Sequence, residues 1–390
     1  MPKWTNWSGK LSEPKVELKH IYSETSAAAL ALAATAAGQR VRAVGSGHSH
    51  QPLIPGTEMI VDLQGLAGII QCDTAAQTAW VYGGSRIFSL GRGLHEAGLA
   101  LPNQGDIDQQ TISGAIATGT HGTGATLGSL STRVVGCQLA TAAGELVECS
   151  PEVEPELWQA SRLHLGALGL VTRVKLALVE AYRLTEHGWQ CPLAQLFDEF
   201  ENLIEQHRHF EFFWYPQTDT AHAKYIDQTD AAAQYPVGEE GTRTAWSYEV
   251  LPNHRPARHT EMEYSVPRDQ GMACMRDIQE LLNKEFTDVR WPVEYRTLAA
   301  DDVWLSTAFE RPTVTISVHQ GMDADDTAYF HACEEIFLAY GGKPHWGKVN
   351  YLNGEQMAAL HPRWQDWWRV RDAIDPQGTF LNAYLESLRG

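Results

Sequence analysis

The sequence has a deficit of basic residues: 30 Lys and Arg stand against 48 Asp and Glu in a chain of 390, giving a formal net charge of −18. A chain this acidic is a poor partner for the phosphate backbone of nucleic acids or for an anionic membrane surface. The acidic residues are spread along the chain instead of forming a tail. We therefore expect no nucleic-acid polymer and no membrane as partner, and the charge indicates solubility.

Cysteine is scarce and never closely spaced. The six cysteines form no CxxC motif; they are Cys72, Cys137, Cys149, Cys191, Cys274 and Cys333. This spacing argues against a zinc ribbon, a thioredoxin-like site and a small disulfide scaffold. His207 and His209 have the wrong spacing for one helical face. We therefore expect no metal site.

Long hydrophobic runs are also missing. The most apolar stretch, residues 27–38, is rich in alanine and falls well short of the ~20 residues that a membrane-spanning helix needs. The first residues contain no apolar stretch typical of a secretory signal. We expect a monomeric cytoplasmic protein with reduced cysteines.

What is present is a globular composition, with 43% apolar and 20% charged residues, and enough length for two domains. The first ~180 residues alternate between strand-like and helix-like segments, which predicts an α+β half with a mixed sheet. The predicted strands are 16–22, 40–44, 59–63, 79–82, 133–141, 145–148 and 170–176, and the predicted helices are 27–37, 87–97 and 157–163. Residues 111–128 are rich in glycine and threonine and show no clear periodicity.

The composition changes near Tyr182, where aromatic strands begin. The predicted strands of this half are 210–215, 222–226, 293–296, 313–319 and 345–352, and the predicted helices are 272–286, 327–340, 362–374 and 381–388. Residues 227–243 are polar and predict an exposed loop.

Glycine-rich segments carry the first functional signal. The segment Gly45 to His50 follows a predicted strand, but His50 replaces the third glycine of a GxGxxG motif and no helix pattern follows, so a nicotinamide-binding loop is disfavoured. Two readings remain from spacing alone: an ordinary glycine turn, or a loop whose N–H groups converge on a phosphate. Two further segments, 113–124 and 166–172, are also rich in small residues. A backbone with so few large side chains can lie against a large flat group.

Together these segments resemble the FAD-binding domain of the vanillyl-alcohol-oxidase family, and most closely its branch of sugar-lactone and alditol oxidases. The resemblance extends over almost the whole chain. Its motifs are NW at 6–7, GSGHS at 45–49, ATGTHGTG at 117–124, HLGALGLVT at 164–172, EYR at 294–296, HWGK at 345–348 and FLNAYLE at 380–386.

The resemblance implies a two-domain FAD-binding fold. Residues 1–178 would bind FAD, residues 179–360 would form a substrate (cap) domain with an antiparallel sheet, and residues 361–390 would pack back on the FAD domain. The implied cofactor-binding residues are Gly45, Ser46, Gly47, His48, Ser49, Ser113, Gly114, Ala117, Thr118, Gly119, His121, Gly122, Gly169, Val171 and Asn382. The family pattern also implies a single covalent link between FAD and His48. Without the resemblance, a solvent-facing histidine would be the better interpretation of this residue.

The resemblance likewise implies which residues contact the substrate. Glu294 and Arg296 share one strand face because residues i and i+2 point the same way, although a surface salt bridge is the ordinary explanation of such a pair. Lys348 is the third implied residue, against the ordinary reading of a surface lysine. The family histidine falls on Ser317 by gap-free counting while His319 lies two residues further on, so the identity of this donor stays open between two residues of one face.

The implied reaction is oxidation of a CH–OH group in a small uncharged polyol, sugar or sugar-1,4-lactone, with O2 reduced to hydrogen peroxide. Two enzymatic alternatives remain: a dehydrogenase of the same fold that uses a quinone or cytochrome, and oxidation of the primary alcohol of a larger sugar-containing molecule such as a nucleoside. A non-catalytic flavin- or sugar-binding protein is disfavoured, because mere binding does not need three charged residues in one cleft.

Overall fold

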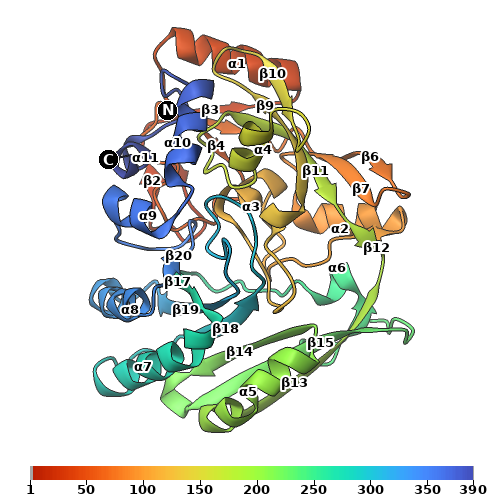
Figure 1. The fold of residues 1–390 in the computed structure, drawn as a ribbon, viewed down its shortest axis with the longest axis vertical. Coiled ribbons are helices and arrows are strands. Elements are labelled where there is room, and N and C mark those ends of the chain that lie inside the picture. The colour runs from red at the N-terminus through yellow and green to blue at the C-terminus, as the bar shows by residue number, and fades with distance from the viewer. Residues whose placement is uncertain (1–2, 390) are drawn as a thin grey trace.

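The structure is a computed structural model of the chain that describes residues 3–389. It consists of an upper part of several smaller sheets with helices and a lower part built on one large sheet (Figure 1). The strands of the upper part are β1 (Trp4–Thr5), β2 (Ser12–Glu13), β3 (Glu17–His20), β4 (Val41–Val44), β5 (Met59–Asp62), β6 (Ile69–Asp73), β7 (Thr78–Tyr82), β8 (Leu99–Ala100), β9 (Val134–Ala140), β10 (Leu146–Cys149), β11 (Leu170–Ala177) and β12 (Val179–Glu180). Its helices are α1 (Glu24–Ala36), α2 (Ile87–Glu96), α3 (Ile112–Thr118) and α4 (Pro155–Ser161).

Two sheets of this part are held together by helix α1. One is a parallel sheet of order β3-β5-β4, and the other is antiparallel with order β10-β9-β11-β7-β6. The buried alanines of α1 pack in one apolar cluster with residues of both sheets, because the small side chain lets the helix approach closely. Ser23 caps the helix through the backbone N–H of Ser26, as its sequence predicts.

The lower part is an eight-stranded antiparallel sheet with order β16-β13-β15-β14-β18-β19-β17-β20. Its strands are β13 (Arg183–Pro192), β14 (His209–Tyr215), β15 (Thr220–Thr229), β16 (Thr244–Trp246), β17 (His259–Pro267), β18 (Val293–Leu298), β19 (Thr313–Gly321) and β20 (Lys343–Pro344), and its helices are α5 (Leu193–Gln206), α6 (Ser247–Val250), α7 (Gly271–Lys284) and α8 (Thr327–Ala339). Helices α5 and α7 lie along the outer face, away from the upper part (Figure 1).

Alternation along the strands decides which side chains meet those helices. Val314, Ile316 and Val318 of β19 enter the apolar core shared with α7 and α8, and the residues between them face the upper part. The sheet therefore has an apolar outer face and a polar inner face, and both are buried.

The chain ends with α9 (Gly354–Leu360), α10 (Trp364–Ile374) and α11 (Ala383–Leu388), which return to the upper part. The indole Nε1–H of Trp367 donates to the carbonyl oxygens of Ala160 and Leu163. The buried guanidinium of Arg42 donates to the backbone carbonyls of Leu53, Gly166 and Phe380, and it thereby joins three distant segments.

Three sequence predictions are wrong in the structure. The described residues of the first half form no mixed sheet: the sheet β3-β5-β4 is wholly parallel, the sheet β10-β9-β11-β7-β6 is wholly antiparallel, and helix α1 packs against both. Residues 345–352 do not form a strand: the ladder ends at Pro344, and the Gly347 N–H donates to the side chain of His345, which turns the backbone. Residues 111–128 do contain regular structure, helix α3, whose alanine- and glycine-rich turns have no apolar periodicity to reveal them. Strands β6, β13 and β17 and helices α5 and α9 lie outside the predicted elements.

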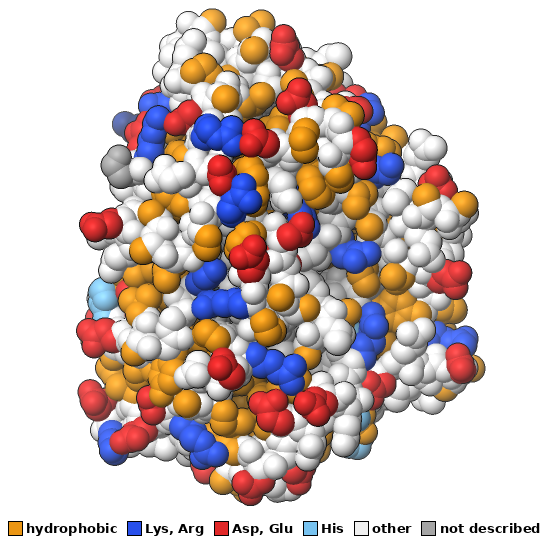
Figure 2. All heavy atoms as spheres, in the orientation of Figure 1, with side chains coloured by type: hydrophobic (Ala, Val, Ile, Leu, Met, Phe, Trp, Pro, Cys, Tyr) orange, Lys and Arg blue, Asp and Glu red, His pale blue; other side chains and the backbone are white. Residues whose placement is uncertain are grey.

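Acidic and basic side chains are interspersed over the face shown in Figure 2, without a large area of one sign. Among residues 3–389, no helix is both long and apolar enough to cross a membrane.

Candidate active site

A cleft of about 740 Å³ separates the inner face of the large sheet from loops of the upper part. Glu294, Arg296, His319 and Lys348 all line it. A second cavity of about 80 Å³ contains His48 and shares Lys348 with the cleft. Four of the five residues predicted to contact substrate are therefore brought together beside the predicted flavin-linking histidine.

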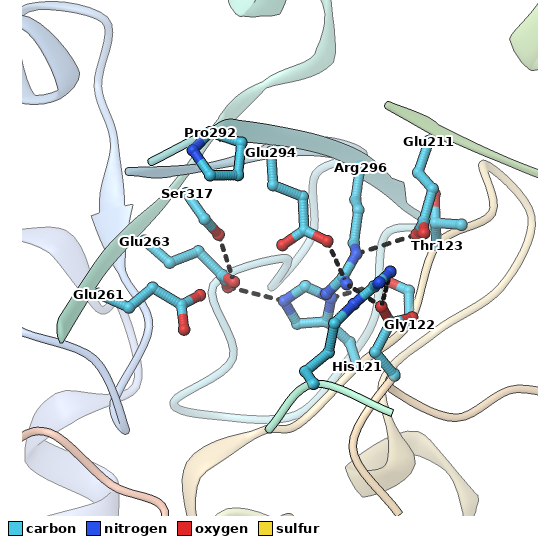
Figure 3. A network of polar contacts seen from close by, with 12 residues as sticks. His121, Gly122, Thr123, Glu211, Glu261, Glu263, Pro292, Glu294, Arg296 and Ser317 are labelled. Atoms are coloured by element: carbon cyan, nitrogen blue, oxygen red, sulfur yellow. Dashed lines mark hydrogen bonds and ion pairs between the residues drawn. The ribbon is translucent and has the colours of Figure 1, made fainter. Parts of the chain in front are cut away.

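The register of the strands arranges these side chains in rows. Glu263 of β17, Ser317 of β19 and Glu294 of β18 are direct cross-strand partners. The hydroxyl of Ser317 donates to Glu263 at 2.9 Å, as Figure 3 shows. Ser317 itself does not line the cleft. His319, the other candidate for the same role, does line the cleft, and its Nδ1–H donates to the Pro292 carbonyl at 2.8 Å.

Arg296 is one cation among three carboxylates. Its Nε lies 3.1 Å from Glu211, its terminal nitrogen lies 3.7 Å from Asp106, and it is ion-paired with Glu294. Burial raises the pKa of Glu294 well above its ordinary value; Arg296 opposes this, but Glu211 and Asp106 add to it. Glu294 therefore takes up a proton far more readily than an exposed carboxylate does.

His121, from the predicted cofactor motif, reaches from a loop of the upper part to Glu263 of the large sheet. Its Nε2 is 2.8 Å from Glu263 Oε1 and its Nδ1 is 2.8 Å from the carbonyl oxygen of Gly122. Burial opposes a charge on the ring, but Glu263 and both hydrogen bonds raise the pKa of His121 above its ordinary value. Because both ring nitrogens face acceptors, the ring is doubly protonated and forms a buried ion pair.

Lys348 lies on an irregular segment that follows β17 closely. The N–H of His345 donates to the Glu263 carbonyl and the N–H of Val349 donates to the Glu261 carbonyl, both at 2.9 Å. The Lys348 ammonium is ion-paired with the Glu261 carboxylate. The lysine thus reaches the cleft without a strand of its own.

His48 is held in position by the NW motif near the start of the chain. The Trp7 N–H donates to the Gly47 carbonyl at 2.7 Å, the Asn6 amide donates to the Ser49 carbonyl at 3.0 Å, and the Trp7 ring stacks on His48. Burial, with the nearby cations Lys348 and Arg86, lowers the pKa of His48 to about 4. The imidazole is therefore neutral, which leaves a lone pair on one ring nitrogen.

The loops predicted to hold FAD are hydrogen-bonded to one another and to their neighbours, and they contribute His121 to the cleft and His48, Ser49 and Thr118 to the smaller cavity. The Ser113 N–H donates to Gly83, the Gly83 N–H donates to Thr172, and the Leu165 N–H donates to Ala117. A Cβ on Gly45 would lie 2.2 Å from the hydroxyl of Thr111, so this packing needs glycine.

Unpartnered polar atoms test whether a further polar group fits there. Gln110 Oε1, Thr120 Oγ1 and His50 Nδ1 are buried without a hydrogen-bond partner among the described residues, and all three side chains line the two cavities. Buried polar atoms are normally hydrogen-bonded, so these residues fit a large polar cofactor such as FAD.

The remaining predicted cofactor residues take different positions. Gly45 to Ser49, Ser113 and Gly119 are half-buried, Gly114 is exposed, and Ala117, Thr118 and Gly122 are buried. Val171 packs in the core and a Cβ on Gly169 would meet the Ala140 carbonyl oxygen. The buried amide of Asn382 donates to the Pro52 and Pro55 carbonyls at 2.8 and 2.7 Å.

Several residues of the cleft lining were not predicted from the sequence, among them Asp106, Arg255, Glu261 and Glu263. Glu211, which pairs with Arg296, was not predicted either. The signal for two of them was present. Strand β17 reads HTEMEYSVP, in which Glu261, Glu263 and Ser265 alternate with Met262, Tyr264 and Val266, as in a strand with one apolar face.

Two family models match the chain. The D-arabinono-1,4-lactone oxidase model matches residues 174–246 and 231–388, and a model described as an FAD binding domain matches residues 21–150. An L-gulono-1,4-lactone dehydrogenase of Mycobacterium tuberculosis is 33% identical over 428 aligned residues, covering 100% of this chain and 99% of the relative. An alditol oxidase of a Streptomyces species is 28% identical, with 98% of both chains covered.

Solved structures agree in fold. A cholesterol oxidase from Brevibacterium sterolicum matches with a TM-score of 0.89 and 16% sequence identity, over 100% of this chain and 96% of the other. At this identity the likeness concerns the fold alone, and it bears out the expected α+β FAD-binding architecture.

Proposed function

Since the chain belongs to the D-arabinono-1,4-lactone oxidase family of FAD-linked oxidoreductases, we propose that it oxidises a CH–OH group of an uncharged polyol, sugar or sugar-1,4-lactone. Acidic and basic side chains are paired along the cleft, among them Arg255 with Glu240, Arg296 with Glu294 and Lys348 with Glu261. A wall of paired charges offers many hydrogen bonds, which suits a polyhydroxylated substrate without charge of its own.

One observation carries this proposal: Glu294, Arg296 and Lys348 line a single cleft beside His48. Oxidation of an alcohol removes a hydride from carbon and a proton from oxygen. When bound, FAD supplies the hydride acceptor. The chain must then bind the hydroxyl, accept its proton and stabilise the negative charge that develops on its oxygen.

We propose that different side chains carry out these tasks. Glu294, with its raised pKa, accepts the hydroxyl proton. Arg296 and Lys348 donate hydrogen bonds to the developing alkoxide, and their carboxylate partners Glu211 and Glu261 keep both cations in place. His319 orients a neighbouring hydroxyl, and Ser317 positions Glu263.

FAD would be held by the loops at 45–49, 113–122 and 169–171, and Asn382 would fix the segment that follows the first loop. His48 would carry the single covalent link. Its neutral imidazole and its stacking on Trp7 support this role. We propose residues 1–178 as the FAD domain, 179–360 as the cap domain and 361–390 as a returning C-terminal segment. The monomeric state and the cytoplasmic location remain predictions.

For the electron acceptor we propose O2, which would yield hydrogen peroxide. A dehydrogenase that uses a quinone or cytochrome is the second candidate, favoured by the relative at 33% identity that is named a dehydrogenase. The test is anaerobic reduction of the purified protein by a panel of lactones, alditols and sugars, followed by air. Bleaching that air reverses rapidly, with one peroxide per flavin, supports the oxidase, whereas rapid recovery only with an added quinone supports the dehydrogenase. A protein that no member of the panel bleaches would contradict the proposed substrate class.

A further inference from the structure

The cleft, whose volume of about 740 Å³ must also hold the flavin ring, extends well beyond its reactive end. It continues beyond Glu294 across strands β14, β15 and β13, where no predicted substrate residue lies.

A single cross-strand row marks this extension. Glu294 is the partner of Phe213, Phe213 is the partner of His222, and His222 is the partner of Gln190. All four residues line the cleft. Neighbouring strands lie about 4.8 Å apart, so His222 stands roughly 10 Å from Glu294 along the sheet. A sugar ring covers about one strand spacing, so the His222 end of the row is free to bind another part of the substrate.

Aromatic side chains form the floor of this outer end. Phe213 and Tyr215 are half-buried, and the ring centroids of Tyr215 and His222 lie 4.6 Å apart. His222 and Gln190 are exposed. The outer end therefore has an aromatic floor, with an amide and an imidazole at its edge.

Arg255 forms the inner boundary of this region. Its guanidinium lies 5.1 Å from the centroid of the Phe213 ring, and its nitrogens are held by Glu240 at 2.7 Å and Asp106 at 3.2 Å. About a third of its side chain, 34%, stays accessible. A guanidinium fixed in this way offers a flat cationic surface on which aromatic rings stack.

We propose that the outer end, formed by Phe213, Tyr215, His222, Gln190 and Arg255, is a subsite for a planar aromatic group joined to the sugar that is oxidised. The preferred substrate is then a sugar conjugate whose hydroxyl meets Glu294 and Lys348 while its ring stacks at the outer end. This inference rests on the proposed function and narrows its substrate class. Nucleosides and aryl glycosides are the two sources of this chemistry.

The test compares matched pairs of substrates: adenosine with ribose, and phenyl glucoside with glucose. We expect the ring-bearing member of at least one pair to have a KM lower by about tenfold or more, since stacking of one ring contributes this much. Preference within the adenosine pair alone identifies a nucleoside subsite, and preference in both pairs identifies a subsite for any planar ring. Equal KM values within both pairs overturn the proposal.

Substitutions at the outer end test whether the ring of the substrate binds there. Tyr215→Ala and His222→Ala should each raise the KM for the ring-bearing substrate by about fivefold to tenfold, with kcat for that substrate and both constants for the parent sugar unchanged. Tyr22→Ala serves as control, because this tyrosine is 74% exposed and does not line the cleft. If Tyr215→Ala and His222→Ala behave like Tyr22→Ala, the subsite is refuted.

An equilibrium titration separates this inference from the proposed function. 5′-Deoxyadenosine and phenol carry the rings without the reactive hydroxyl of the corresponding substrate. Their binding, followed by protein fluorescence, should weaken in Tyr215→Ala whether or not any sugar is oxidised. Ring binding without oxidation of any sugar would refute the proposed function alone, and oxidation of sugars without ring binding would refute the subsite alone.

Discussion

His121 Nε2 lies 2.8 Å from Glu263 Oε1, and the two side chains come from opposite sides of the cleft. His121 belongs to the loop of the upper part and Glu263 to β17 of the large sheet. Both side chains are only 3% exposed. One buried ion pair therefore joins the two halves of the molecule within the lining of the cleft.

The stability contribution of this pair should depend on pH in a defined window. The pKa of Glu263 is lowered in the folded protein, where burial is outweighed by His121 and His345, so its contribution is lost as pH falls below its ordinary range. The raised pKa of His121 gives a contribution that is lost as pH rises through the folded value. Glu263→Gln should cost about 3 kcal/mol or more near pH 6 and less at higher pH, as measured by thermal unfolding.

Ser317→Ala is the matched control for this change. It removes one hydrogen bond to the same carboxylate and should cost about 1 kcal/mol at every pH in that window. Equal pH dependence in the two variants would mean that the His121–Glu263 contact is not an ion pair.

Lys348 and Glu294 should act in the same half-reaction. Lys348→Met removes a donor to the developing alkoxide and the lysine partner of Glu261, so flavin reduction should slow by around 100-fold or more. Glu294→Gln keeps the size but cannot accept the proton, and should slow reduction to a similar extent. Stopped-flow absorbance measures this step, and the double variant should lose less than the product of the single losses. Near-normal reduction rates in both variants with full flavin content would mean that Lys348 and Glu294 do not take part in flavin reduction.

The pH profile of reduction should report on Glu294. Because burial raises its pKa, the carboxylate is protonated below that value, and reduction should become slower as pH falls. Glu294→Gln should remove this limb of the profile. Because the pKa of Glu294 is higher in the folded protein than in the unfolded chain, ionisation of Glu294 lowers the free energy of unfolding as pH rises. Glutamine carries no charge, so the Glu294→Gln variant should be at least as stable as the parent at neutral pH. A retained acidic limb in Glu294→Gln would assign the titration to another group.

The link through His48 is tested by colour. The native protein should keep its yellow colour with the polypeptide after acid denaturation, and His48→Ala should lose it. His50→Ala is the control, since its imidazole lies two residues away and is also kept neutral by burial, with a pKa of about 3. Flavin that washes out of the native protein in acid excludes the covalent bond.

Asn382 should matter for stability more than for catalysis. Its side chain accepts the Leu385 N–H at the start of α11 and donates to the loop at residues 52–55. Asn382→Ala should lower the free energy of unfolding by roughly 2–3 kcal/mol, from one helix cap and two hydrogen bonds, with unchanged reduction kinetics. A large kinetic effect without loss of stability would instead indicate contact with the cofactor.

The elements that the sequence predicted are those with a local signal. Helix α1 has its serine cap and its terminal glycine, and β19 alternates between apolar and hydroxyl-bearing residues. These patterns depend only on the residue itself and its neighbours in the chain. The motif resemblance then supplied Glu294, Arg296 and Lys348, which no local pattern distinguishes from surface charges.

Strand β17 shows why the rest was missed. Glu261 and Glu263 are buried only because the upper part covers the inner face of the sheet, and their charges are acceptable only because Lys348 and His121 arrive from elsewhere. The false strand at 345–352 has the same origin. Its apolar residues suggest pairing, but the side chain of His345 takes up the Gly347 N–H and ends the ladder.

The Arg42 side chain makes the upper part depend on a segment 338 residues further along the chain. Its guanidinium donates to the carbonyl of Phe380 as well as to those of Leu53 and Gly166. A buried donor that loses an acceptor is costly. Removal of the segment around Phe380 should therefore loosen the packing around Arg42 inside the upper part, and its effect would not stay at the site of the cut.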